Sequence, residues 1–134
     1  MKIKLFMIAV IFALVSCKGE KPEIDKAKTA VEACLKAIDK GEYAKVKTEY
    51  YSTEFGSGET EEELSGKFKK LKEVTGDMQS FEVKESSLNE EPGEDAKIIL
   101  VYAVKHARVT TLEKFVVIIE EGKYKITLHD IRNE

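Results

Sequence analysis

The sequence has few of the residues from which small exported domains and metal sites are usually built. It contains two cysteines, two histidines and no tryptophan. With only Cys17 and Cys34, the chain lacks a disulfide framework, so packing must supply its stability. Cys34 falls on an apolar helical face and is expected to be a small buried residue. The histidines show no paired zinc-ligand spacing, which argues against a zinc site.

Basic charge is also scarce. The chain has 22 Lys and Arg against 25 Asp and Glu, a formal net charge of −3, and no basic stripe. Nucleic-acid binding depends on Lys and Arg that displace counterions from phosphates, so this class of function is excluded. The chain also lacks a phosphate-cradling glycine loop and a nucleophile elbow. We therefore expect no nucleic-acid partner, no metal and no cofactor, and we interpret the acidic segment 89–95 as an exposed turn.

The residues that the chain does have in abundance are apolar, and they gather first at the N-terminus. Two lysines precede an unbroken apolar run of eleven residues (5–15), which is followed by Ser16 and Cys17. A membrane-spanning helix needs about 20 apolar residues, so this run is too short to span a bilayer. A positive start, a short apolar run and a small residue are typical of a signal peptide.

Residues 14–17 (Leu-Val-Ser-Cys) resemble the lipobox of bacterial lipoproteins. The resemblance implies cleavage before Cys17 and a diacylglyceryl group on its sulfur, whose two acyl chains anchor a protein firmly. It divides the chain into a signal peptide (1–16), a lipidated cysteine with a tether (17–23) and one domain (24–134). The expected location is the bacterial cell envelope, with Cys17 as the membrane attachment. Lys18, where aspartate would retain a lipoprotein in the inner membrane, favours an outer membrane. An ordinary secretory signal with an incidental cysteine is the alternative.

The first half of the domain has the spacing of helices. Apolar residues three and four apart predict a helix from 24 to about 40, ending at a glycine. A second, shorter helix is expected to end near Ser52, before a loop at 54–58. A third begins at Thr60, because Thr60 and Glu63 form a capping-box pattern.

The second half changes to a period of two and predicts four antiparallel strands, near 81–89, 96–106, 111–121 and 123–131. The second and third are apolar on both faces, so both faces should be covered. Helices are expected on one face, and sheet curvature or a second molecule on the other. Ile131 is out of step with Ile126, which predicts a bulge near 129–130 or the end of the strand there.

Helices followed by a four-stranded antiparallel meander form an α+β arrangement that resembles the NTF2-like (cystatin-like) superfamily, in particular small bacterial lipoproteins with domains of unknown function. Residues 39–43 (Asp-Lys-Gly-Glu-Tyr) are similar to the family's glycine-acidic-aromatic hinge after the first helix. Residues 121–126 are similar to its Gly-x-Trp-Lys turn, with Tyr124 in place of the tryptophan. The resemblance implies a curved sheet around a long helix, a cone with a pocket at its open end. Tyr50, Phe55 and Tyr102 are expected to line that pocket.

No catalytic constellation stands out in this domain. His106 ends a strand, where a solvated position is usual, and neighbours such as His129 and Asp130 point to opposite faces of a regular strand. We place no acidic residue on the inner face of the central strands. The expected function is therefore non-catalytic: binding of a small ligand or a partner protein. A small enzyme of the isomerase or dehydratase type, acting in the cone, is the alternative. Homodimerisation through the doubly apolar sheet is compatible with both.

Overall fold

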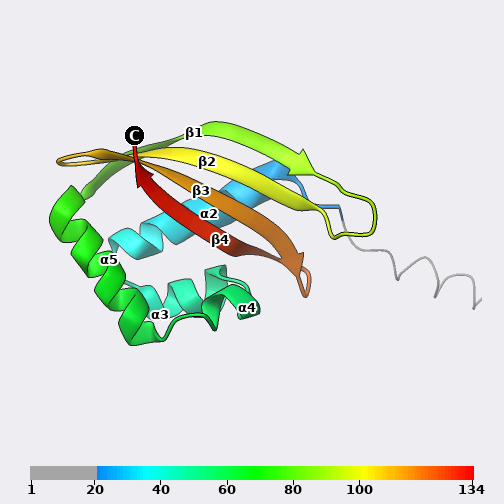
Figure 1. Ribbon diagram of the computed structural model, residues 1–134, viewed down its shortest axis with the longest axis horizontal. Helices are drawn as coiled ribbons and strands as arrows, with labels where there is room; N and C mark the ends of the chain where they lie inside the picture. Colours follow the sequence, from blue (N-terminus) through cyan, green and yellow to red (C-terminus); the bar gives the residue numbers. More distant parts are fainter. Residues whose placement is uncertain (1–20) are drawn as a thin grey trace, which may run out of the picture.

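The computed structural model describes residues 21–134 and shows an α+β fold, as the sequence predicts (Figure 1). The predicted signal peptide and lipidation site, Cys17, lie outside the described residues. Helical elements come first: α2 (Ile24–Asp39), α3 (Tyr43–Lys45), the π-helical turn η2 (Val46–Tyr50), α4 (Thr53–Gly56) and α5 (Glu61–Thr75). The strands follow: β1 (Met78–Asn89), β2 (Lys97–His106), β3 (Thr110–Glu120) and β4 (Lys123–Asn133). Within this described part, none of the helices combines the length and the apolar character needed to cross a membrane.

Helix α2 forms because one stripe of its surface is apolar. Ala27, Val31, Cys34 and Leu35 recur at three- and four-residue steps and are 0% exposed. Gly41 follows the end of the helix with a φ of 77°, a left-handed conformation that glycine adopts without strain. The predicted burial of Cys34 is confirmed, and burial raises the pKa of its thiol, which makes it a packing residue.

The capping box predicted for the start of α5 is present. The Thr60 hydroxyl accepts a hydrogen bond from the Glu63 N–H at 3.1 Å, and the Glu63 carboxylate accepts one from the Thr60 N–H at 3.4 Å. The loop predicted at 54–58 is wrong in its first half. Helix α4 forms there because Ser52 Oγ accepts a hydrogen bond from the Phe55 N–H at 3.2 Å, which caps a new helical turn.

The four strands form one antiparallel sheet in chain order, β1-β2-β3-β4. Strands β3 and β4 are joined by Glu121 and Gly122, whose φ values of 51° and 77° are those of a type I′ hairpin turn. The helices lie on one face of the sheet (Figure 1), here called the inner face. No described helix covers the other, outer face.

Strand β4 contains a β-bulge. The partners of Val116 and Val117 are Leu128 and Ile126, so Thr127 is an extra residue in the ladder. An extra residue reverses the inner-outer alternation of everything that follows it.

The bulge returns the end of β4 to the inner face. His129 pairs with Phe115 and Ile131 pairs with Glu113, and both partners on β3 are buried. The bulge predicted near 129–130 therefore exists, but it lies at Thr127. The sequence pattern shows only that the alternation changes between the two isoleucines, and it does not fix the residue.

The two apolar faces of strands β2 and β3 differ in how deeply their side chains are buried. The inner-face residues are 0–1% exposed: Ile98, Leu100, Tyr102, Val104, Phe115 and Val117. The outer-face residues are only half-buried: Ile99, Val101, Val116 and Ile118. Cover of the inner face by helices is confirmed, whereas cover of the outer face by a second molecule stays a prediction.

Candidate functional site

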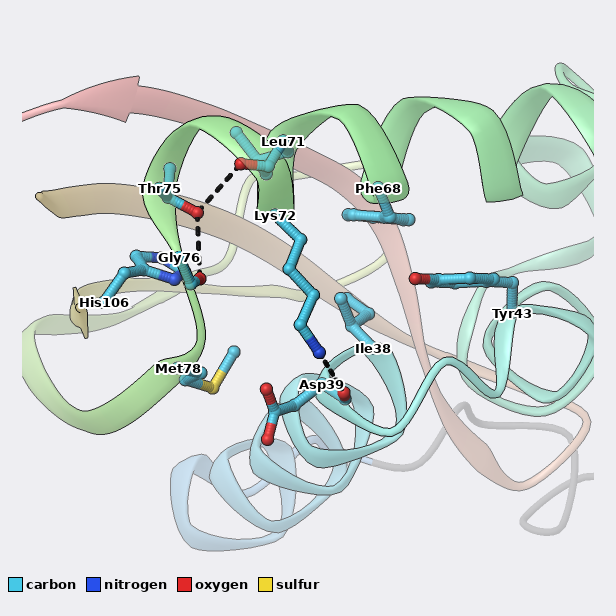
Figure 2. Close-up of a pocket in the computed structure, with 10 residues that line it drawn as sticks. All are labelled: Ile38, Asp39, Tyr43, Phe68, Leu71, Lys72, Thr75, Gly76, Met78 and His106. Atoms are coloured by element: carbon cyan, nitrogen blue, oxygen red, sulfur yellow. Dashed lines mark hydrogen bonds between the residues drawn. The ribbon is translucent and has the colours of Figure 1, made fainter. Parts of the chain in front are cut away.

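A small cavity lies where the C-terminal ends of α2 and α5 meet the sheet. Its apolar walls include Ile38 from α2, Phe68 and Leu71 from α5, and Met78 from β1, and His106 closes it from β2 (Figure 2). The cavity has a volume of about 30 Å³. One ordered water needs roughly 10–15 Å³ on this measure, so the space holds about two waters and no larger ligand.

Two of the polar residues at the edge of the cavity, Lys72 and Thr75, have partners within the protein, whereas the Tyr43 hydroxyl and the Asp39 carboxylate are free to meet a ligand. Lys72 Nζ donates to the Asp39 carbonyl at 3.2 Å and forms an ion pair with Asp77 at 3.4 Å. Figure 2 shows Lys72 extended across the opening toward Asp39. Thr75 Oγ1 donates its proton to the Leu71 carbonyl at 2.9 Å, within its own helix. The Lys72 ammonium and the Thr75 hydroxyl are therefore already hydrogen-bonded within the protein.

Behind the cavity, a chain of hydrogen bonds runs through the core. His106 Nε2 lies 3.2 Å from Thr111 Oγ1, and Thr111 Oγ1 lies 2.8 Å from one carboxylate oxygen of Glu113. The other Glu113 oxygen lies 2.7 Å from His129 Nε2, and His129 Nδ1 lies 3.0 Å from the Tyr51 hydroxyl. These five side chains, the Glu113 network, connect the cavity wall to the far side of the core.

The donors and acceptors of the Glu113 network can be assigned from its chemistry. A carboxylate only accepts, so Thr111 and His129 Nε2 both donate to Glu113. Thr111 has then used its proton and accepts from His106 Nε2. Burial raises the pKa of Tyr51, as do the negative charges around it, so its hydroxyl stays protonated and is the hydrogen-bond partner of His129 Nδ1.

Glu113 is the charged centre of this network. Burial by itself would raise the pKa of its carboxyl, but the His106 ring 3.9 Å away and hydrogen bonds from His129 and Thr111 outweigh burial and lower the pKa to about 2. The residue is only 3% exposed. A carboxylate that is ionised, paired and sealed in this way is a poor general acid or base, because it binds a proton only near pH 2.

Local structure explains why these residues meet. Glu113 lies two residues before Phe115 on the same face of β3, and the Thr127 bulge turns His129 inward beside it. The His129 ring then stacks between Phe115, with ring centroids 4.2 Å apart, and Phe68, at 6.0 Å.

Two expectations about chemistry are therefore wrong. His106 was expected at a solvated strand end but is 8% exposed, because the 106–109 turn folds back over the end of α5. No acid was expected on the inner face of the central strands, yet Glu113 lies there. Glu113 lies two residues before Phe115 and four before Val117, so the alternation of β3 places all three on the same face. A charge in that position indicates a buried partner, which the chain supplies as two histidines.

The three aromatic residues expected to line a pocket do not line this cavity. Tyr102 is 1% exposed between sheet and α2, where its hydroxyl donates to Glu32 at 2.9 Å. Burial, together with this carboxylate, raises the pKa of Tyr102. Phe55 packs on Tyr51 with ring centroids 4.6 Å apart, and Tyr50 is half-buried in η2. Their role in binding a ligand stays a prediction.

The described residues contain no group of three or more His, Cys, Asp or Glu side chains placed to hold a metal ion. They also contain no buried side-chain nitrogen or oxygen without a hydrogen-bond partner. The fully buried polar side chains of residues 21–134 are thus satisfied within the domain.

No family model matches the chain, and no curated protein matches it. Among solved structures, the chain is similar to a Streptomyces avermitilis protein described as a "putative dehydratase" of the NTF2-like family. The two share 10% sequence identity with a TM-score of 0.54, and the match covers 83% of this chain and 95% of the other. The chain therefore has an NTF2-like fold. At this level of sequence identity, the similarity supports the assignment of the fold but not of the activity.

Proposed function

We propose that this chain is a lipid-anchored protein of the bacterial cell envelope whose NTF2-like domain is non-catalytic and works by binding a partner protein. The lipobox-like residues 14–17 support the anchor, with Cys17 as the lipidated residue. The net negative charge of the chain argues against nucleic acid as a partner.

The closed interior is the observation that carries the proposal. A cavity of about 30 Å³ has no room for a substrate, and Glu113 is paired and ionised at physiological pH. Every described buried polar side-chain atom has a partner inside the domain. These observations favour action through the surface of the domain over catalysis in this cavity.

A second candidate is an enzyme of the isomerase or dehydratase type. The Glu113 network favours it, because His106 belongs both to that network and to the cavity wall. Such an enzyme would have to open the cavity well beyond its present volume, and would need a reactive acid or base that the locked Glu113 does not supply.

One measurement separates the two candidates. Native mass spectrometry would be done on the full chain, extracted from membranes in mild detergent. We expect the mass of the chain with the lipid on Cys17 and no further small molecule. A reproducible additional small mass that survives extraction would contradict the partner-protein proposal and favour the enzyme. Crosslinking in intact membranes then identifies the partner.

The anchor is tested separately. Cys17→Ser removes the sulfur that carries the lipid, so we expect the protein to leave the membrane fraction. Cys34→Ser is the matched control, because Cys34 is buried and should not affect fractionation. Protein that stays in the membrane fraction after Cys17→Ser would overturn the lipid anchor.

The outer face of the sheet supports self-association as well. Ile99, Val116 and Leu128 lie side by side across β2, β3 and β4, and Leu128 is 40% exposed. The occupant that we propose for this face is a second copy of the chain. A two-fold axis parallel to the strands places β1 of one copy over β4 of the other.

Charge complementarity favours this arrangement. The outer face of β1 carries Glu82, which forms an ion pair with Lys84 at 2.8 Å, and Glu85, and that of β4 carries Lys123 and Arg132. Asp130, the one acid on the outer face of β4, has Lys114 of β3 as its cross-strand neighbour. The acidic border of one copy would therefore face the basic border of its partner.

A further inference from the structure

The described chain enters the domain at one end of the sheet. Lys21 forms an ion pair with Glu90 at 3.4 Å, in the β1–β2 turn, and the Glu23 N–H donates to the Tyr124 hydroxyl at 2.8 Å, at the start of β4. Both contacts hold the beginning of the domain against the β1–β2 and β3–β4 turns (Figure 1). We call this the anchored end: residues 21–26, 89–97 and 119–124.

The cavity lies at the opposite end of the strands. There the β2–β3 hairpin folds over the C-terminus of α5: the Ala107 N–H donates to the Asp77 carbonyl and the Arg108 N–H to the Thr75 carbonyl, each at 2.9 Å. The ten residues of β2 separate the two ends by about 30 Å. We call the second end the distal pole: residues 36–40, 69–77, 105–110 and 132–134.

The two ends carry opposite charge. The anchored end has eight acidic and four basic residues, a net charge of −4: Glu23, Asp25, Glu90, Glu91, Glu94, Asp95, Glu120 and Glu121 against Lys21, Lys26, Lys97 and Lys123. The distal pole has eight basic and four acidic residues, a net charge of +4: Lys36, Lys40, Lys69, Lys70, Lys72, Lys105, Arg108 and Arg132 against Asp39, Glu73, Asp77 and Glu134. The chain as a whole is acidic, so this separation is not visible in its net charge.

We propose that the domain stands on the membrane with its acidic anchored end toward the lipid, and that the basic distal pole is an interaction surface for an acidic region of a water-soluble envelope protein. The proposal rests on the lipid anchor proposed above and adds to it an orientation, a surface and the charge of the partner.

The length of the tether supports the orientation. Four residue steps separate Cys17 from Lys21, and fully extended chain spans at most about 3.6 Å per residue, so the anchored end stays within roughly 14 Å of the lipidated sulfur. The distal pole then lies a further 30 Å or so away, several times the Debye length of about 8 Å at physiological salt. The lipid surface therefore cannot neutralise the pole, which remains available to an acidic partner.

Energy transfer to the membrane tests the orientation. The full lipidated chain would be placed in vesicles that contain acceptor-labelled lipid, with a donor dye on Glu91→Cys at the anchored end or on Val74→Cys at the distal pole. Val74 is 68% exposed, so the dye should not disturb packing. We expect at least threefold more transfer from position 91. Equal or reversed transfer would overturn the orientation.

The unsubstituted chain distinguishes failure of the orientation from failure of the lipid anchor. Its Cys34 is buried, and a lipidated Cys17 has no free thiol, so it should take up no dye. Dye on Cys17, in a chain that stays off the vesicles, would contradict the proposed anchor itself.

A charge-reversal pair tests the surface. Fluorescent poly-L-glutamate serves as the acidic probe, added to the lipidated chain in neutral phosphatidylcholine vesicles. Lys40→Glu with Lys70→Glu reverses two exposed charges of the distal pole, and Lys26→Glu with Lys97→Glu makes the same charge change at the anchored end. We expect the first pair to weaken binding at least tenfold and the second less than twofold. Equal losses, or no binding by the unsubstituted chain, would overturn the proposed surface.

Discussion

The inner and outer faces of the sheet are formed by the same strands, but the inner face is buried in the core and the outer face remains partly exposed. On β3, Phe115 and Val117 point inward and are 0% exposed, while their neighbours Val116 and Ile118 point outward and stay half-buried. The inner face also holds a charged residue, Glu113, in a completed set of hydrogen bonds. The outer face keeps its charged residues exposed, among them Glu85 on β1, Lys114 on β3 and Arg132 on β4.

This difference shows which apolar side chains are buried when the domain folds and which remain accessible to a binding partner. The inner face is complete: its apolar side chains pack on the helices, and its buried charge accepts hydrogen bonds from Thr111 and His129. The outer face keeps apolar area that folding does not bury, the usual sign of an interaction site. The comparison is tested best by substitutions that should disturb one face and leave the other unchanged.

The largest effect is expected at the centre of the inner face. Glu113→Ala removes the acceptor for Thr111 and His129 and leaves their donors unpaired in the core. We expect the free energy of unfolding to fall by about 3–5 kcal/mol, as for other broken buried pairs. Urea denaturation followed by circular dichroism measures it.

Glu85→Ala is the matched control, since it removes an exposed glutamate from the outer face of β1. We expect a change within about 0.5 kcal/mol. A cost below about 1 kcal/mol for Glu113→Ala would contradict the view that the inner face depends on this carboxylate.

The next effect is a dependence on pH. The carboxyl of Glu113 has a pKa of about 2 in the folded state, below its ordinary value of 4.5. A lowered pKa means that the ionised form stabilises the fold above pH 4.5, and that this stability is lost as the pH falls toward 2. The shift corresponds to roughly 3 kcal/mol, of which about 2 kcal/mol should be gone at pH 3.

Glu113→Gln isolates this contribution, because the amide keeps the shape and does not titrate. The difference in unfolding free energy between the two chains should shrink as the pH falls from 6 to 3. A difference that stays constant over this range would show that Glu113 is not held ionised in the core.

The sequence predicts the elements well and their interior contacts poorly. Local rules suffice for the capping box at Thr60 and for the alternation of β2 and β3, because each depends on neighbouring residues. Thr127 is different: a bulge depends on how two strands pair, and the alternation of one strand shows only that a bulge exists.

The Glu113 network depends on the same long-range pairing. Its members are far apart in the chain, and His129 joins it only because of the bulge. The even spacing of Glu113 from Phe115 was visible, but a charged residue is so rarely buried that its position on the inner face is understood only with its partners in view. Tyr50, Phe55 and Tyr102 illustrate the converse, since aromatic residues mark a core as readily as a pocket.

The smallest effect on folding and the clearest one on assembly are expected at the outer face. Leu128→Glu places a charge at the β4 end of the row formed with Ile99 and Val116, where the side chain is 40% exposed. The fold should lose less than about 1 kcal/mol, because the position is not part of the core.

The dissociation constant of the homodimer should rise at least tenfold, since a carboxylate would have to be buried against apolar side chains of the partner copy. Sedimentation-equilibrium centrifugation gives this constant. Val74→Glu makes a related change at an apolar site away from the sheet that is 68% exposed, and it should leave the constant unchanged. If the unsubstituted chain is a monomer at every concentration, or if both variants weaken association equally, the outer face is not the dimer surface.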